Sequence, residues 1–136
     1  MGVTIAARFD AKALIVHVIN QRDIDAIEHA VNRAILAEIP ETLDDMVRNF
    51  REDRWQQLNE ALSKYQRKGN RLQPMISVGE PVQEILALGQ KYSVDLIVMG
   101  AHGRGRITRL LTGSKAETMF RLSSIPILSV RQESNF

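Results

Sequence analysis

An uninterrupted apolar run that ends in glycine constrains this chain more than any other stretch. Residues 96–99 read LIVM, and Gly100 follows them. A strand with one face in water alternates polar and apolar residues, whereas a strand of a parallel sheet with helices on both faces does not. The run therefore predicts a strand buried on both faces, in a chain whose 136 residues can bury a sizeable core.

Similar apolar segments recur along the chain and alternate with segments of helical periodicity. Strands are predicted at residues 13–19, 71–78, 94–99 and 125–130. Helices are predicted at residues 1–9, 23–38 and 41–68, and two further helices are predicted to begin at Pro81 and at Ser114. Strands that alternate with helices build a parallel sheet with right-handed crossovers. The predicted fold class is α/β, a doubly wound parallel sheet, as a single domain over residues 1–136.

Local signals predict where some of these elements lie. Residues 71–78 alternate more than the other strands, and Pro126 begins the last one, so both are predicted at sheet edges. Gly89 stands inside a helical pattern, where glycine costs about 1 kcal/mol relative to alanine. Close packing of that helix on the sheet is the predicted reason for this glycine.

Composition excludes several classes of protein. The chain has no cysteine, so it has no disulfide framework, and no apolar run approaches the ~20 residues of a membrane helix. The first residues lack the pattern of a signal peptide. We therefore predict a cytoplasmic protein without membrane contact. A net charge of +2 is too small to indicate a nucleic-acid partner.

Glycines and a helix start follow the central run. The glycines are Gly100, Gly103, Gly105 and Gly113. Ser114 and Glu117 then form an S-x-x-E capping box, which predicts a helix N-terminus. Glycine lets a backbone approach a ligand closely, and the first amides of a helix have no intrahelical partner and favour negative charge. The order strand, glycine loop and helix predicts an anion site.

The charge of this stretch agrees with an anion site. Residues 100–121 contain five basic residues and one acid, whereas the whole chain carries only +2. Two phosphate loops are excluded, because Ser114 precedes Lys115 in the wrong order for a P-loop and the glycines do not match the dinucleotide fingerprint. A loop without ligand, in which Ser114 only caps its own helix, is the alternative.

The remaining spacing, Gly100-x2-Gly103-x9-Gly113-Ser114 after the strand VDLIVMG, resembles the ATP-binding class of the universal stress protein family. The segments LIVHVI, VGEPVQEI and IPILSV extend the resemblance to residues 11–131. It implies an adenine-nucleotide alpha-hydrolase-like fold and a cofactor that is ATP or AMP, with or without Mg²⁺. It also implies a homodimer through the last strand.

The resemblance implies the residues of the nucleotide site. The backbone at Val18 matches the family's adenine contact. The positions that hold the ribose and phosphates in the family are matched here by Met99, Gly100, Gly103, Gly113, Ser114 and Lys115. His102 and Arg104 lie in the same loop and are expected beside the phosphates.

One part of the family pattern has no counterpart in this chain. The family begins with a strand that ends in an aspartate, followed by a helix. Residues 1–9 resemble that helix, and Asp10 comes too late to replace the aspartate. We weigh a shortened chain, which we favour, against a neighbouring chain that fills the gap and a rearranged sheet. Strands beside a gap would lose backbone partners, at about 1–3 kcal/mol for each buried group.

The predicted function is a small regulatory protein of the stress response that binds ATP or AMP. The alternative is a dimeric interaction module of the same fold that works without nucleotide. No carboxylate pair or activated nucleophile accompanies the loop, and His17, His29 and His102 are scattered, so at most slow ATP hydrolysis is expected. The arginines lack interleaved aromatic residues, which argues against nucleic acid as a partner.

Overall fold

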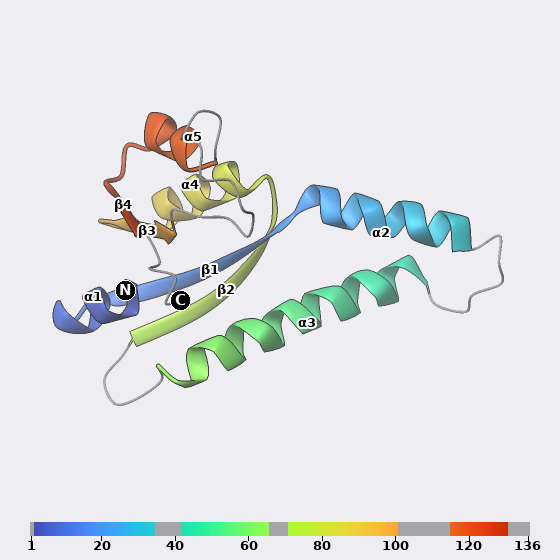
Figure 1. Ribbon diagram of the computed structural model, residues 1–136, viewed down its shortest axis with the longest axis horizontal. Helices are drawn as coiled ribbons and strands as arrows, with labels where there is room; N and C mark the ends of the chain where they lie inside the picture. Colours follow the sequence, from blue (N-terminus) through green and yellow to red (C-terminus); the bar gives the residue numbers. More distant parts are fainter. Residues whose placement is uncertain (1, 35–41, 66–70, 101–114, 131–136) are drawn as a thin grey trace, which may run out of the picture.

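The computed structural model of the chain describes residues 2–34, 42–65, 71–100 and 115–130 (Figure 1). Its elements are α1 (Gly2–Arg8), β1 (Lys12–Asn20), α2 (Gln21–Ala34), α3 (Leu43–Ser63), β2 (Arg71–Gly79), α4 (Pro81–Lys91), β3 (Ile97–Gly100), α5 (Lys115–Leu122) and β4 (Ile127–Val130). Every strand and helix predicted from the sequence has a counterpart here, and the boundaries differ by a few residues.

The four strands form two separate parallel pairs in the part of the chain that the structure describes. β1 pairs with β2 in continuous register from Lys12 opposite Arg71 to Asn20 opposite Gly79. β3 pairs with β4 over four residues. The parallel direction agrees with the predicted fold class. The sheet is nevertheless divided, because β1 and β3 are not bonded to each other.

The helices cover the two pairs differently. α2 and α3 run antiparallel and extend beyond the strands as an arm, in which α3 packs against β2 (Figure 1). α4 contacts both β1 and β2 as well as α5. Pro74 lies within β2, where it lacks the N–H that a second neighbouring strand would need. This proline agrees with the predicted edge position of β2.

α2 begins earlier than the sequence analysis predicts. The predicted helix starts at residue 23, but the observed helix starts at Gln21, and the Asn20 side chain accepts a hydrogen bond of 3.2 Å from the backbone N–H of Arg22. Asparagine caps a helix as well as aspartate does. The strand β1 therefore passes directly into α2 through its last residue.

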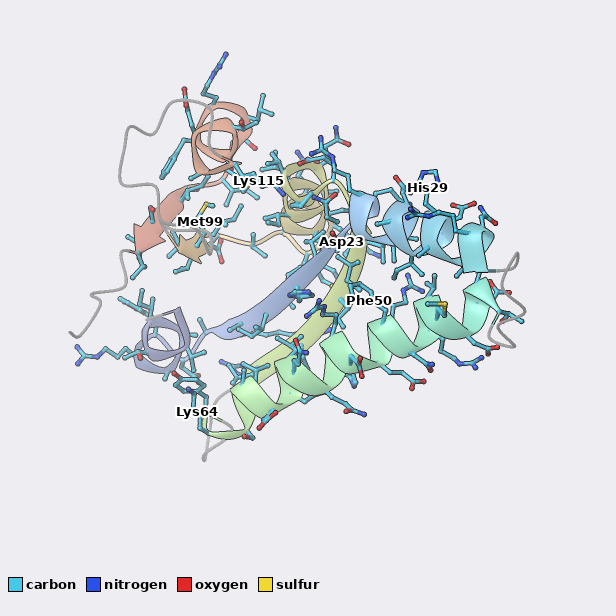
Figure 2. All side chains as sticks on the ribbon, turned by 45° about the vertical axis from the view of Figure 1, so that its right-hand side comes forward. Asp23, His29, Phe50, Lys64, Met99 and Lys115 are labelled. Carbon is cyan, nitrogen blue, oxygen red and sulfur yellow. The ribbon has the colours of Figure 1, made fainter. Side chains whose placement is uncertain are left out.

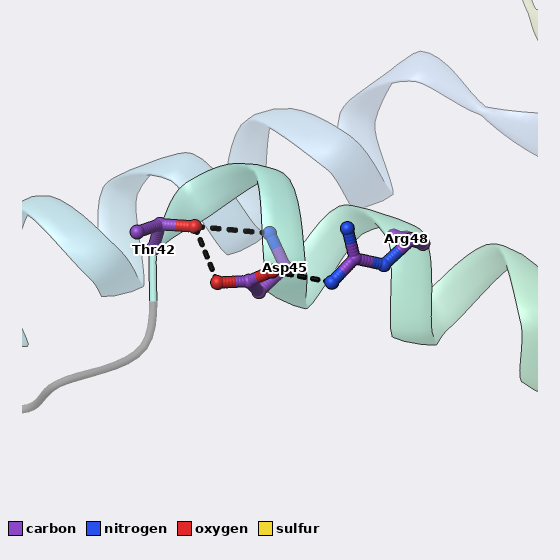
Figure 3. Close-up of polar contacts among 3 residues, drawn as sticks. All are labelled: Thr42, Asp45 and Arg48. Carbon is purple, nitrogen blue, oxygen red and sulfur yellow. Dashed lines mark hydrogen bonds and ion pairs between the residues drawn. The ribbon is translucent and has the colours of Figure 1, made fainter.

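α3 is fixed at its start by a small polar network (Figure 3). The Thr42 hydroxyl accepts from the backbone N–H of Asp45 at 3.2 Å and donates to its carboxylate at 2.7 Å. Arg48 also pairs with this carboxylate. Two hydrogen bonds lower the pKa of Asp45. The larger effect comes from the Thr42 side chain and the next from Arg48. Because threonine is a strong N-cap, the helix begins at Leu43 rather than at the predicted residue 41.

A compact apolar cluster joins α4, α5, β3 and β4. Val82, Ile97 and Met119 are buried at its centre. Gly89 faces it, and a Cβ built there would lie 2.8 Å from Cδ1 of Ile125. This distance confirms the predicted close packing at Gly89, since real Cβ contacts are longer.

β3 differs from the strand that the sequence predicts. Residues 94–99 were expected to be buried on both faces, but the strand begins only at Ile97, and the preceding Leu96 is 41% exposed. Val98 is only partly buried. The physical reason is the divided sheet: within the described residues, no strand lies against the edge of β3 that faces away from β4.

His17 makes stability depend on pH. Burial lowers the pKa of this β1 side chain below its ordinary value of 6.5, and the nearby Arg54 guanidinium lowers it further. Below pH 6.5 the unfolded chain therefore binds more protons than the folded one, so the free energy of unfolding is expected to fall as pH is lowered through this value. Urea denaturation above and below pH 6.5 measures the change.

The matched variants are His17→Gln, which is expected to reduce this dependence, and His29→Gln, which removes an exposed histidine of α2 and is expected to keep it. Equal pH dependence in both variants would rule out His17 as its source.

Candidate functional site

The predicted site begins where β3 ends. Gly100 is exposed and lies opposite Val130, and no described atom beyond its chain neighbours comes within 4 Å of a Cβ built there. The side chain of Met99, by contrast, packs against the cluster of Val82, Ile97 and Met119. The side chain of Met99 is therefore partly taken up by this packing, whereas Gly100 leaves open space beside the strand end.

The helix that follows the glycine loop begins at Lys115. A helix therefore follows the glycine stretch as predicted, whereas the predicted cap Ser114 lies outside the described residues. Lys115 is exposed, and Ala116 and Met119 hold the opposite side of α5 in the core. Figure 2 shows Met99 and Lys115 on the side of the molecule that carries α4 and α5, away from the arm of α2 and α3.

The middle of the predicted loop lies outside the described residues. These positions are His102, Gly103, Arg104, Gly113 and Ser114. Their roles remain predictions from the sequence. The structure describes the strand before them and the helix after them.

Val18 lies on the other strand pair. It is partly buried in β1 and stands opposite Ser77 of β2. The Ser77 hydroxyl donates to the carboxylate of Glu84 in α4. The sequence analysis did not single out this pair, and the available signal was weak: a glutamate in the first turn of the helix that begins at Pro81.

The turn between β2 and α4 is closely packed beside this pair. Gly79 has a φ of +154°, and a Cβ there would lie 2.7 Å from Oε1 of Glu84. Glu80 caps α4 by accepting from the backbone N–H of Gln83 at 3.0 Å. This turn therefore holds Glu84 against the carboxyl end of β2, near the strand position of Val18.

A cavity of about 930 Å³ separates the two strand pairs. Met99 and Gly100 line it together with residues of α1 and β1. Of the other predicted site residues that the structure describes, Val18 and Lys115 lie outside its wall. The residues of the predicted site are thus distributed over both strand pairs, and the cavity lies between these pairs.

Two further findings concern the described residues alone. They contain no group of three or more histidine, cysteine, aspartate or glutamate side chains that could hold a metal ion. None of their helices has the length and apolar character needed to cross a membrane.

Comparison with known sequences identifies relatives along nearly the whole chain. The sequence profile of the universal stress protein family matches residues 1–131. The chain is 26% identical over 128 residues to universal stress protein MJ0577 of Methanocaldococcus jannaschii, a match that covers 91% of this chain and 79% of the relative. It is 32% identical over 94 residues to universal stress protein YxiE of Bacillus subtilis, covering 68% of this chain and 64% of that protein.

Solved structures share the fold. The structure of MJ0577 superposes with a TM-score of 0.73 at 22% identity, over 98% of this chain and 87% of that one. The universal stress protein UspA from Lactobacillus plantarum superposes with a TM-score of 0.63 at 20% identity, over 95% of this chain and 83% of that one. These similarities confirm the predicted α/β fold with parallel strands. Since the family profile covers nearly all residues, the chain belongs to the universal stress protein family.

Proposed function

We propose that this chain is a small regulatory protein of the stress response that binds an adenine nucleotide, ATP or AMP, with or without Mg²⁺. The phosphates would lie between the end of β3 and the start of α5, held by the backbone of the glycine loop. The backbone at Val18 would contact adenine. The residues of this site are those predicted from the sequence: Val18, Met99, Gly100, His102, Gly103, Arg104, Gly113, Ser114 and Lys115.

The observation that carries the proposal is the geometry on either side of the loop. β3 extends to Gly100, where no described atom comes within 4 Å of a Cβ built on the backbone, and α5 includes Lys115 on the other side of the loop. A ligand in an open α/β sheet binds outside the carboxyl ends of the strands. The free amides at the start of α5 and the positive end of its dipole favour a phosphate there.

The distribution of charge supports the same ligand. Lys115 is exposed at the helix start, and Arg104 belongs to the loop. Charge-assisted contacts to phosphate are stronger than neutral hydrogen bonds. A nucleotide would thus find backbone donors and cations on the same stretch of chain.

Stabilisation by nucleotide tests this proposal. A ligand that binds only the folded state at ten times its dissociation constant raises the free energy of unfolding by about 1.4 kcal/mol. We therefore expect ATP or AMP to raise the unfolding temperature in a concentration-dependent way, measured by differential scanning fluorimetry and by calorimetric titration. The absence of any shift at millimolar nucleotide would reject the proposal.

Two glycine variants test whether nucleotide binding depends on the motif or on any glycine of the loop. Gly113 belongs to the motif, whereas Gly105 lies in the same stretch but outside its spacing. Gly113→Val is expected to abolish the shift, because its side chain blocks the approach of the backbone to phosphate, and Gly105→Val is expected to keep it. An equal response of both variants would contradict the assigned motif.

A dimeric interaction module is the second candidate function, and the edge of β4 favours it. In the described residues β4 pairs only with β3, and Leu128 on β4 is 38% exposed. A free strand edge can pair with a second chain. If sedimentation finds a dimer that Gly113→Val leaves intact, and nucleotide gives no shift, this second function replaces the first.

A further inference from the structure

A carboxylate covers the carboxyl end of β2. The Ser77 hydroxyl of this strand donates to Oε2 of Glu84, which lies in the first turn of α4. The other carboxylate oxygen, Oε1, lies beside Gly79, the last residue of β2, at 2.7 Å from a Cβ built on that glycine. Because residue 79 is a glycine, the carboxylate can lie close to the backbone along the last three positions of the strand.

The register of the sheet relates this carboxylate to the predicted adenine contact. Ser77 is the cross-strand partner of Val18, and Gly79 is the partner of Asn20, the last residue of β1. Neighbouring strands lie about 4.8 Å apart. Since one hydrogen bond joins Glu84 to Ser77, its carboxylate lies within roughly 10 Å of the backbone of Val18. The carboxylate and the predicted contact thus belong to the same end of the same strand pair.

One oxygen of Glu84 is able to accept a further hydrogen bond. Within the described residues Oε1 has no hydrogen-bond partner, and Glu84 forms no ion pair. Among the described side chains that are not exposed, every polar atom shielded from solvent has a hydrogen-bond partner, so Oε1 is reachable from solvent. An ionised carboxylate offers about four acceptor positions, and the Ser77 hydroxyl fills one of them. A donor at the strand ends therefore finds an acceptor in Glu84.

Packing alone does not require a charged side chain at this place. The core-facing side of α4 is otherwise apolar, because Val82 is buried and Ile85 and Leu86 pack against the apolar cluster around it. A carboxylate at the interface between a helix and a sheet loses hydration, and apolar residues of similar shape stabilise such an interface as well or better. Glu84 and its partner Ser77 thus indicate a role in binding a ligand.

We propose that Glu84, held by Ser77, determines the specificity of the nucleotide site for a purine with an amino group at C6. This inference rests on the proposed binding of an adenine nucleotide. An amino group donates to the carboxylate, whereas the carbonyl oxygen of a 6-oxopurine faces it with a second acceptor. A site that opposes two acceptors in this way discriminates against the wrong base. Ser77 is then a positioning residue, which fixes the direction of the carboxylate.

The unchanged chain provides the first test. Inosine triphosphate has the ribose and phosphates of ATP but carries an oxo group at C6. Calorimetric titration of each nucleotide into the whole chain is expected to give a dissociation constant at least about tenfold lower for ATP than for inosine triphosphate. Equal affinities would overturn the proposal and leave the proposed nucleotide site in place. If neither nucleotide binds, both the proposed function and this inference are wrong.

Two glutamine variants assign the discrimination to one carboxylate, because backbone contacts at Val18 would also distinguish the two bases. Glu84→Gln keeps the shape of the side chain and replaces one oxygen by an amide that donates to a carbonyl oxygen. The ratio of the two dissociation constants is expected to fall at least about fivefold. Glu80→Gln removes the same charge from the neighbouring N-cap of α4 and is expected to keep the ratio. An equal response of both variants would contradict the assignment to Glu84.

The ratio also separates specificity from a merely structural role. If the hydrogen bond between Ser77 and Glu84 only fastened α4 to β2, its loss would weaken the binding of both nucleotides by the same factor and leave the ratio unchanged. Ser77→Ala removes the anchor but keeps the carboxylate, so the ratio is expected to fall at least about twofold and by less than in Glu84→Gln. Circular dichroism checks that each variant folds. If Glu84→Gln does not fold, Ser77→Ala decides, and an unchanged ratio in that variant would overturn the proposal.

Discussion

Replacing Met119 by alanine is expected to lower the free energy of unfolding by about 2–5 kcal/mol. The side chain is 0% exposed and forms the centre of the apolar cluster with Val82 and Ile97. Its removal exchanges these contacts for a cavity, because packed surroundings relax only in part. Urea denaturation monitored by circular dichroism measures the difference.

Phe120→Ala provides the matched control for this prediction. Phe120 is the next residue of α5 and is 50% exposed, so its truncation is expected to cost less than about 1 kcal/mol. Similar losses in the two variants would mean that Met119 does not hold α5 in the way the structure indicates. Met99 packs against the cluster to which Met119 belongs, so the loss of Met119 is expected to weaken the nucleotide response by loosening α5 against β3.

Replacing Gly89 by valine is expected to destabilise the protein toward the upper end of about 1–3 kcal/mol. Even a Cβ at this position would lie 2.8 Å from Cδ1 of Ile125 and 3.4 Å from Cγ2 of Val94. Valine adds two methyl groups to that space, where Cδ1 of Ile97 also lies 3.7 Å from the built Cβ. Thermal and urea unfolding measure the loss.

Ala87→Val controls for the effect of valine on the helix. It places the same β-branched side chain on the exposed face of α4, where only the modest propensity cost of valine applies. The difference between the two variants isolates the packing effect at Gly89. A Gly89→Val protein as stable as the Ala87→Val protein would mean that α4 can move away from β3 and β4 at little cost.

Much of the secondary structure follows from local patterns. The apolar segment of β1, the proline at the start of α4 and the glycine inside it were each interpreted correctly, because periodicity and backbone restrictions act within a few residues. The start of α2 was wrong by two residues, since Asn20 and Asp23 are equivalent acceptors and the pattern does not choose between them.

The candidate site, too, could be predicted from local patterns only in part. The capping box predicted a helix after the glycine stretch, and α5 lies there, while Ser114 itself lies outside the described residues. The partly buried side chain of Met99 packs against the core cluster, which the sequence pattern of the site positions did not indicate. Ser77 and Glu84 meet only because β2 and α4 pack together through Gly79, so no local pattern indicated their hydrogen bond.

The sequence by itself determined the order of strands and helices, the parallel α/β class and the basic glycine stretch between β3 and α5. These depend on periodicity, on capping residues and on the special backbone of glycine and proline, all of which are local. Only the tertiary structure decided that β1 and β3 remain apart, that Leu96 is exposed and that a cavity of about 930 Å³ lies between the strand pairs. Whether a strand is buried depends on the neighbours that occupy its two edges and faces. Those neighbours are set by packing between segments far apart in the chain, which the pattern of one strand does not record.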